Sequence, residues 1–235
     1  MGRDDQRRET PLPVFTVRDG DLFADLDAAT RATFDAQVRA ATYAVGHTFF
    51  APEDQGDRIF LLRSGRVRLY RLSPEGRALT VAVLEPQAVF GEMALTEGWH
   101  HDSFAEAMTD VQVGVVRRDI LRALLDRHPA VALRVMAVMS SRIRAVERKL
   151  ADIAFKSVAQ RLATVLLSLG DPRDSVPAAD RRVVRYTHQQ LAEMIGSYRE
   201  TVTKVLGEFR EAGLIRVEDD AIQLSDVARL HALAG

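Results

Sequence analysis

The chain has 235 residues, of which 47% are hydrophobic and 28% are charged, and its formal net charge is −1. This length fits roughly two domains of ordinary globular composition. The absence of cysteine excludes disulfides, cysteine nucleophiles, cysteine zinc sites and cysteine-held iron–sulfur clusters. No apolar run approaches the roughly 18 residues of a membrane helix, and the charged start lacks a signal-peptide core. We therefore expect a cytoplasmic protein without a membrane partner.

The first 20 residues are predicted to form a flexible arm, because they are polar and interrupted by Pro11 and Pro13. A short helix is predicted next. It rests on apolar residues at roughly helical spacing: Leu22, Phe23, Leu26, Phe34 and Val38.

Residues 43–117 alternate short apolar stretches with glycines, which is typical of β-structure. Strands are predicted around residues 67–69, 79–84 and 111–116, with turns at 64–65 and 74–76. Many short strands at this spacing predict a sandwich or a rolled antiparallel sheet.

Residues 118–169 are predicted to be helical, with Pro129 at the start of the main helix. An apolar stripe then recurs at steps of three and four residues, as in a coiled-coil seam: Met136, Met139, Ile143, Val146, Leu150 and Ile153. The stripe could pack on its own domain. Its narrowness favours the same helix of a second chain, and hence a twofold homodimer.

After a loop at residues 170–180, a strand is predicted at 183–186, two helices within 187–213, a hairpin at 214–224 and a short helix at 227–233. Thr187 can cap the first of the two helices, and Gly196 suits a sharp turn between them. This is the helix-turn-helix pattern.

In this motif the start of the second helix meets base edges in the major groove of DNA. Arg199 can bind a guanine through two hydrogen bonds, Glu200 can accept one from cytosine, and Lys204 can reach a guanine or a phosphate. Alone, these charges would fit the solvated face of a surface helix. Their place after a tight turn and before a hairpin favours DNA contact.

The segment Ile195–Leu206, together with Gly91-Glu92 and the central helix, resembles the CRP/FNR family of bacterial transcription factors, over nearly all of residues 22–224. The resemblance implies an α+β fold with four parts. These are a flexible arm (1–20), a jelly-roll cyclic-nucleotide-binding-like sensor (21–128), a dimerisation helix (129–154) and a winged helix-turn-helix domain (155–235), with a hinge at 151–157.

The resemblance also implies double-stranded palindromic DNA with TGTGA-like half-sites, and RNA polymerase, as partners. Arg199, Glu200 and Thr201 match the family, Lys204 replaces an arginine, and Tyr198 stands where a small residue is common. The expected DNA-binding residues are Thr187, Gln189, Tyr198, Arg199, Glu200, Thr201 and Lys204.

The effector pocket fits the family less well. Gly91 and Glu92 match the pair that holds the ribose, although Glu92 fits a buried or capping carboxylate in a turn equally well. Ser103 aligns with a phosphate-binding serine, but Asp102 stands where an arginine is expected. A carboxylate there would repel a phosphate. Val146 and Glu147 replace the two hydroxyl residues that meet adenine. We therefore expect no tight cyclic-AMP binding, so that the sensor takes an unidentified ligand or the protein binds DNA constitutively.

No cofactor or metal site is expected. Haem-bearing members use histidine, but His100 and His101 are predicted to be exposed loop residues. An enzyme is not expected, because no catalytic constellation or phosphate-binding loop is present. The alternative function is a cyclic-nucleotide-type sensory module that acts through protein partners.

Overall fold

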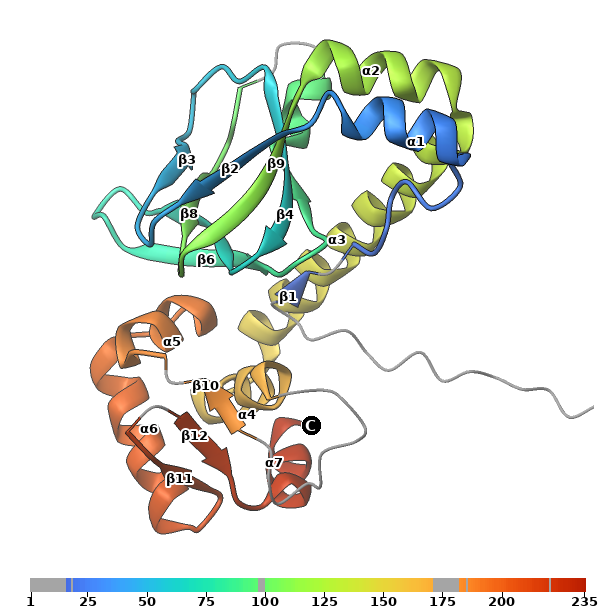
Figure 1. Ribbon diagram of the computed structural model, residues 1–235. Helices are drawn as coiled ribbons and strands as arrows, with labels where there is room; N and C mark the ends of the chain where they lie inside the picture. The colour runs from blue at the N-terminus through green and yellow to red at the C-terminus, as the bar shows by residue number, and fades with distance from the viewer. Residues whose placement is uncertain (1–15, 18, 97–99, 171–181, 185, 220) are drawn as a thin grey trace, which may run out of the picture.

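A computed structural model describes residues 16–17, 19–96, 100–170, 182–184, 186–219 and 221–235. A β-rich N-terminal part and a mainly helical C-terminal part are joined by the long helix α3 (Pro129–Phe155) (Figure 1). The predicted α+β class, with a rolled sheet, a long helix and a winged helix-turn-helix, is confirmed. Most of the predicted arm and of the loop at 170–180 lies outside the described residues.

The N-terminal part, the sensor domain, is built on two sheets. One has the order β1-β6-β5-β8-β3 and the other β2-β9-β4-β7, and only the β1–β6 pairing is parallel among their described pairs. The strands are β1 (Thr16–Val17), β2 (Arg39–Tyr43), β3 (Thr48–Phe50), β4 (Arg58–Ser64), β5 (Val67–Leu72), β6 (Ala78–Leu84), β7 (Val89–Phe90), β8 (Phe104–Ala107) and β9 (Val111–Arg117).

Helix α1 (Ala28–Asp35) begins later than the sequence pattern predicts. Asp27 caps the start of α1, because its carboxylate accepts hydrogen bonds from the backbone N–H groups of Ala29 and Thr30. Leu22 and Phe23 are buried without being helical, in the same cluster as Phe34. The prediction of one helix from Leu22 onward was therefore wrong. The 3-10 helix η1 (Glu92–Leu95) and helix α2 (Arg118–Arg127) complete the sensor domain.

The C-terminal part, the head, contains α4 (Val158–Leu169), α5 (His188–Ile195), α6 (Arg199–Glu211) and α7 (Val227–Ala234). Its three-stranded sheet has the order β10-β12-β11, with β10 (Arg182–Val184), β11 (Ile215–Val217) and β12 (Ala221–Leu224). Much of the hinge predicted at 151–157 is helical, because α3 continues to Phe155. The break falls at Lys156–Ser157, where Ser157 and Gln160 form a capping box that starts α4.

The buried apolar residues form three clusters. One fills the roll around Phe60, Leu62 and Phe90, and a second lies between the roll, α1, α2 and α3. The third is the core of the head, and it includes Val83 of the sensor strand β6. The head therefore packs directly against the sensor domain, with α5 beneath β6 (Figure 1). No helix among the described residues has the length and apolarity needed to cross a bilayer.

Candidate nucleic-acid interface

Helices α5 and α6 form the predicted helix-turn-helix. Thr187 and Gln190 form a reciprocal capping box at the start of α5, with Gln190 N donating to Thr187 Oγ1 over 3.1 Å. Gly196 ends the helix at φ +63°, a left-handed conformation that glycine adopts without strain. His188 Nδ1 lies 2.8 Å from Thr203 Oγ1, which ties the two helices together. The predicted cap and turn are confirmed.

Helix α6 buries one face and exposes the other. Val202, Val205, Leu206 and Phe209 are buried in the core of the head. Arg199, Glu200 and Lys204 are exposed, and Thr201 is half-buried. The charged side chains at the start of α6 are therefore available to a ligand on one side of the head. Their assignment as DNA contacts stays a prediction.

The other predicted contacts lie beside this face. Gln189 is exposed on α5, and its amide donates to Glu193 over 2.9 Å. Tyr198 is the residue before α6, and 60% of it is exposed. Thr187 is exposed and uses its hydroxyl in the capping box.

Three arginines in or next to the strands β5 and β6 contact the head, and none of the three contacts was predicted from the sequence. Arg68 Nη1 lies 2.5 Å from Glu193 Oε2. Arg66 bonds the hydroxyl of Tyr186 and stacks over its ring, and burial raises the pKa of that tyrosine. Arg77 stacks over the ring of Tyr198. No sequence pattern predicts these pairs, because the partners are more than 100 positions apart.

Within the sensor, Glu92 meets the central helix through Arg142, whose Nη1 lies 3.1 Å from Glu92 Oε1. The second Nη atom of Arg142 lies 2.5 Å from Asp19 Oδ2, and the Asp19 side chain is almost fully buried. Asp19 also accepts a hydrogen bond from the backbone of Val89 over 2.8 Å. The carboxylate of Glu92 is thus already paired with a cation of the same chain. Gly91 has φ +81°, and a Cβ there would lie 2.8 Å from the carbonyl oxygen of Arg58, so glycine is needed for this close approach.

Of the remaining predicted pocket residues, Asp102 acts together with Glu92 on the imidazole of His101. Asp102 is 67% exposed and lies 3.7 Å from Arg71 at the surface. Ser103 is half-buried, whereas Val146 and Glu147 are exposed on the outward side of α3. The expected loss of the cyclic-AMP contacts stays a prediction.

His101 is buried, contrary to the prediction that both loop histidines are exposed. Its ring stacks on Phe50 with 3.7 Å between centroids, and its backbone bonds Glu53 and Asp54. Burial lowers the pKa of the imidazole, although the carboxylates of Glu92, Asp54 and Asp102 act in the opposite direction. The prediction failed because the aromatic partner comes from β3, far away in sequence.

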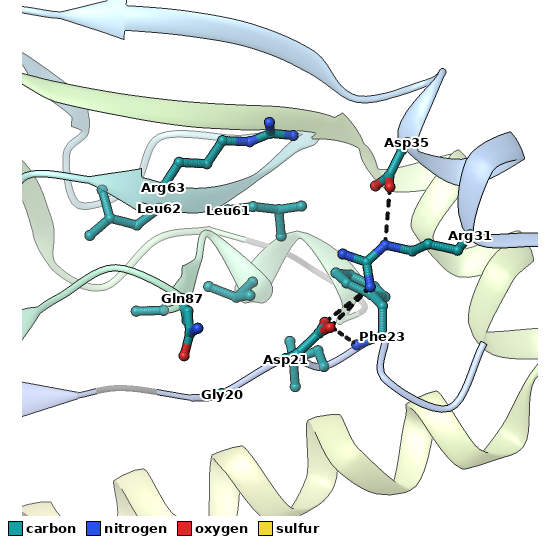
Figure 2. A pocket seen from close by; sticks show the side chains of 12 residues that line it. Gly20, Asp21, Phe23, Arg31, Asp35, Leu61, Leu62, Arg63 and Gln87 are labelled. Atoms are coloured by element: carbon teal, nitrogen blue, oxygen red, sulfur yellow. Dashed lines mark hydrogen bonds and ion pairs between the residues drawn. The ribbon is translucent and has the colours of Figure 1, made fainter. Parts of the chain in front are cut away.

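A cavity of about 410 Å³ lies outside the roll. Figure 2 shows Arg31 at its wall, between the carboxylates of Asp21 and Asp35. Both signs of charge line it together with apolar side chains, and Arg31 is already neutralised. The lining residues are Gly20, Asp21, Leu22, Phe23, Arg31, Asp35, Leu61, Leu62, Arg63, Gln87, Ala88 and Val89.

The apolar stripe of α3 lies largely uncovered. Met136, Ile143, Val146, Leu150 and Ile153 are exposed, with Leu150 at 67%. Met139 instead packs against the cluster between the roll and the helices. Packing on its own domain therefore covers only one of the six predicted seam positions.

Two protein-family models match the chain. "Cyclic nucleotide-binding domain" matches residues 41–128, and "Crp-like helix-turn-helix domain" matches residues 160–233. A CRP-like cAMP-activated global transcriptional regulator of Mycobacterium tuberculosis is 30% identical over 210 residues, which cover 89% of this chain and 94% of that protein. A global nitrogen regulator of Synechococcus elongatus is 36% identical over 182 residues, which cover 75% and 81%.

A solved structure agrees with these relatives. The chain is similar to a CRP/FNR-family transcriptional regulator from Thermus thermophilus, with a TM-score of 0.66 and 31% identity over 83% of this chain and 98% of that one. All three relatives are named as regulators, and two of them as transcriptional regulators.

Proposed function

Because the chain belongs to the CRP/FNR family of transcription regulators, we propose that it is a homodimer that reads a TGTGA-like palindrome through α6. The observation that carries this proposal is the set of exposed side chains at the start of α6: Arg199, Glu200 and Lys204. They follow a tight turn and stand opposite a fully apolar buried face. This is the arrangement that a recognition helix needs in the major groove.

The exposed side chains at the start of α6 can form hydrogen bonds with the edges of DNA bases. Arg199 would donate two parallel hydrogen bonds to O6 and N7 of a guanine, and Glu200 would accept from the N4 amine of a cytosine. Lys204, one turn after Glu200, would reach a further guanine or a phosphate. Each good two-bond contact is worth about 1–3 kcal/mol of discrimination between bases.

The exposed stripe on α3 supports a homodimer. A row of large apolar side chains at heptad spacing is buried when a second copy of the helix packs against it. Twofold symmetry would then present two copies of α6 to successive major grooves about 34 Å apart. A palindromic site follows from that symmetry.

The effector domain would not bind cyclic AMP in the usual way. The pairing of Glu92 with Arg142, the outward position of Asp102 and the lack of hydroxyls at Val146 and Glu147 support this proposal. Another ligand could shift the dimer between two arrangements of its heads, or the protein could bind DNA constitutively. We propose no cofactor, and we place the protein in the cytoplasm with RNA polymerase as its partner at promoters.

The test is fluorescence anisotropy with a labelled TGTGA-N6-TCACA duplex and a scrambled duplex at fixed salt, with and without cyclic AMP. We expect preference for the palindrome that is unaffected by the nucleotide. Equal affinity for both duplexes would contradict the proposed half-site. Preference that appears only with cyclic AMP would keep the DNA-binding function and overturn our interpretation of the pocket.

A further inference from the structure

The hairpin between β5 and β6 reaches the start of the recognition helix. Arg77, the residue before β6, donates from Nη1 to the hydroxyl of Tyr198 over 3.1 Å. Its guanidinium carbon lies 4.1 Å from the centroid of the same ring. Tyr198 directly precedes Arg199, the first residue of α6. A cation of the sensor domain is thus held next to the predicted base-reading residues.

The hairpin presents Arg77 on a fixed turn. Ser73 N donates to the carbonyl of Arg77 over 2.8 Å, and Arg77 N lies 3.2 Å from Ser73 Oγ. Gly76 has φ +80°, and no atom lies near the position that a Cβ would take. Stacking on the exposed ring of Tyr198 then restricts the conformations available to the side chain of Arg77. Such a contact is worth about 0.5–1 kcal/mol at an exposed site.

Arg77 interacts electrostatically with the carboxylate of Glu75 but makes no close ion pair with a described residue. Neither Arg77 nor Arg199 forms an ion pair with a described residue. The nearby carboxylate of Glu75 accepts a hydrogen bond from Ser73 over 2.8 Å. An oriented guanidinium is the side chain best suited to bind phosphate oxygens.

We propose that Arg77, positioned by Tyr198, binds a backbone phosphate of the DNA beside the bases that Arg199 reads. The proposal rests on the proposed DNA-reading function and adds a contact made by the sensor domain. A phosphate contact carries no sequence information, so it changes the affinity for all duplexes alike. It also releases counterions, so it contributes to the salt dependence of binding.

The test measures the slope of log K against log salt concentration for the full-length protein, with the palindromic and the scrambled duplex. For Arg77→Gln we expect the magnitude of the slope to fall by about 0.9 for each phosphate that the protein no longer neutralises, or about 1.8 for two copies on one duplex. The affinity ratio between the two duplexes should stay the same. Arg77→Lys should keep most of the slope, because it keeps the charge.

Two further variants separate positioning from charge. Tyr198→Ala removes the ring on which Arg77 stacks, so the slope of this variant should approach that of Arg77→Gln. The double variant Arg77→Gln/Tyr198→Ala should have the same slope as Arg77→Gln alone. Arg117→Gln is the matched control. That arginine is exposed, pairs with Asp119 and is the last residue of β9, directly before α2. Helix α2 lies at the end of the sensor domain far from the head, so the replacement should leave the slope unchanged (Figure 1).

An unchanged slope in Arg77→Gln, with the unsubstituted protein binding DNA, would overturn the phosphate contact alone. Tighter binding by Arg77→Gln would also overturn it, and would show that the pair with Tyr198 restrains the head. No binding of the unsubstituted protein to either duplex would overturn the proposed function itself, and the phosphate contact with it.

Discussion

Arg68 on β5 and Glu193 on α5 form an ion pair of 2.5 Å between the sensor domain and the head. Both side chains are mostly buried, at 17% and 12% exposure. Arg68 also pairs with Glu106 over 3.1 Å, so one guanidinium neutralises two carboxylates. Because this group lies next to the helix that precedes the recognition helix, it fixes the orientation of the head relative to the sensor sheet.

We predict that Arg68→Met is strongly destabilising. It leaves the carboxylates of Glu106 and Glu193 without their common cation, and breaking a buried pair in this way costs about 3–5 kcal/mol. Denaturant unfolding measures the change. Arg71→Met on the same strand is the control, because its 3.7 Å pair with Asp102 is solvent-exposed and such pairs contribute about 0–1 kcal/mol. Equal effects in the two variants would show that the Arg68 pair does not hold the head.

Arg199→Ala should abolish the preference for the palindrome and leave the oligomeric state unchanged. The variant loses about 1–3 kcal/mol of discrimination at each half-site, whereas its fold is kept because the side chain is exposed. Anisotropy with the two duplexes measures the preference, and sedimentation measures the assembly. Arg210→Ala, in the last turn of the same helix, removes an equal charge and should keep the preference. A variant at Arg199 that still selects the palindrome would refute the recognition-helix assignment.

The helix-turn-helix was predictable because its determinants are local. The cap at Thr187, the turn at Gly196 and the apolar spacing on α6 lie within about two dozen residues and need no distant partner. The same holds for the strands at 79–84 and 111–116, where glycines and turns set the ends. An element that buries one face carries apolar residues at a fixed period, and this period can be read from the sequence.

The tertiary partners of individual side chains could not be predicted, because the sequence does not specify them. His101 is buried because Phe50 on another strand offers its ring, and Glu92 is paired because Arg142 of α3 reaches it. Asp102 lies at the surface, so its charge could not be placed in the roll from its position in the chain alone.

Leu150→Asp should convert the proposed dimer to monomers. Leu150 is exposed in the single chain, so the substitution leaves the fold intact, but a dimer through this stripe would bury two unpaired carboxylates. Analytical ultracentrifugation measures the change, and circular dichroism checks the fold. Val45→Asp is the control, since Val45 is similarly exposed, at 63%, in the turn after β2. If both variants sediment as the unsubstituted protein does, the dimer contact lies elsewhere.

Lys149 gives the protein a specific dependence of stability on pH. Its side chain is buried on α3 and donates to the carbonyl of Thr80 on β6, and burial lowers its pKa to about 7. The unfolded chain holds this proton up to the ordinary lysine pKa of 10.5. Between these two pKa values the unfolded state binds more protons than the folded state. This lysine therefore makes the free energy of unfolding rise with pH, by up to about 1.4 kcal/mol for each pH unit.

Lys149→Met should remove that contribution and stabilise the protein below pH 7, where the folded protein otherwise carries a buried ammonium group. Urea unfolding at pH 6, 7.5 and 9 measures it, as the difference between the variant and the unsubstituted protein. We expect this difference to be largest at pH 6 and to shrink as the pH rises. Lys156→Met is the control, because Lys156 directly follows α3 and forms an ion pair of 3.1 Å with Asp152. Its free energy of unfolding should still rise with pH, because Lys149 is intact. A difference for Lys149→Met that is constant across the three pH values would show that Lys149 keeps its ordinary pKa in the folded protein.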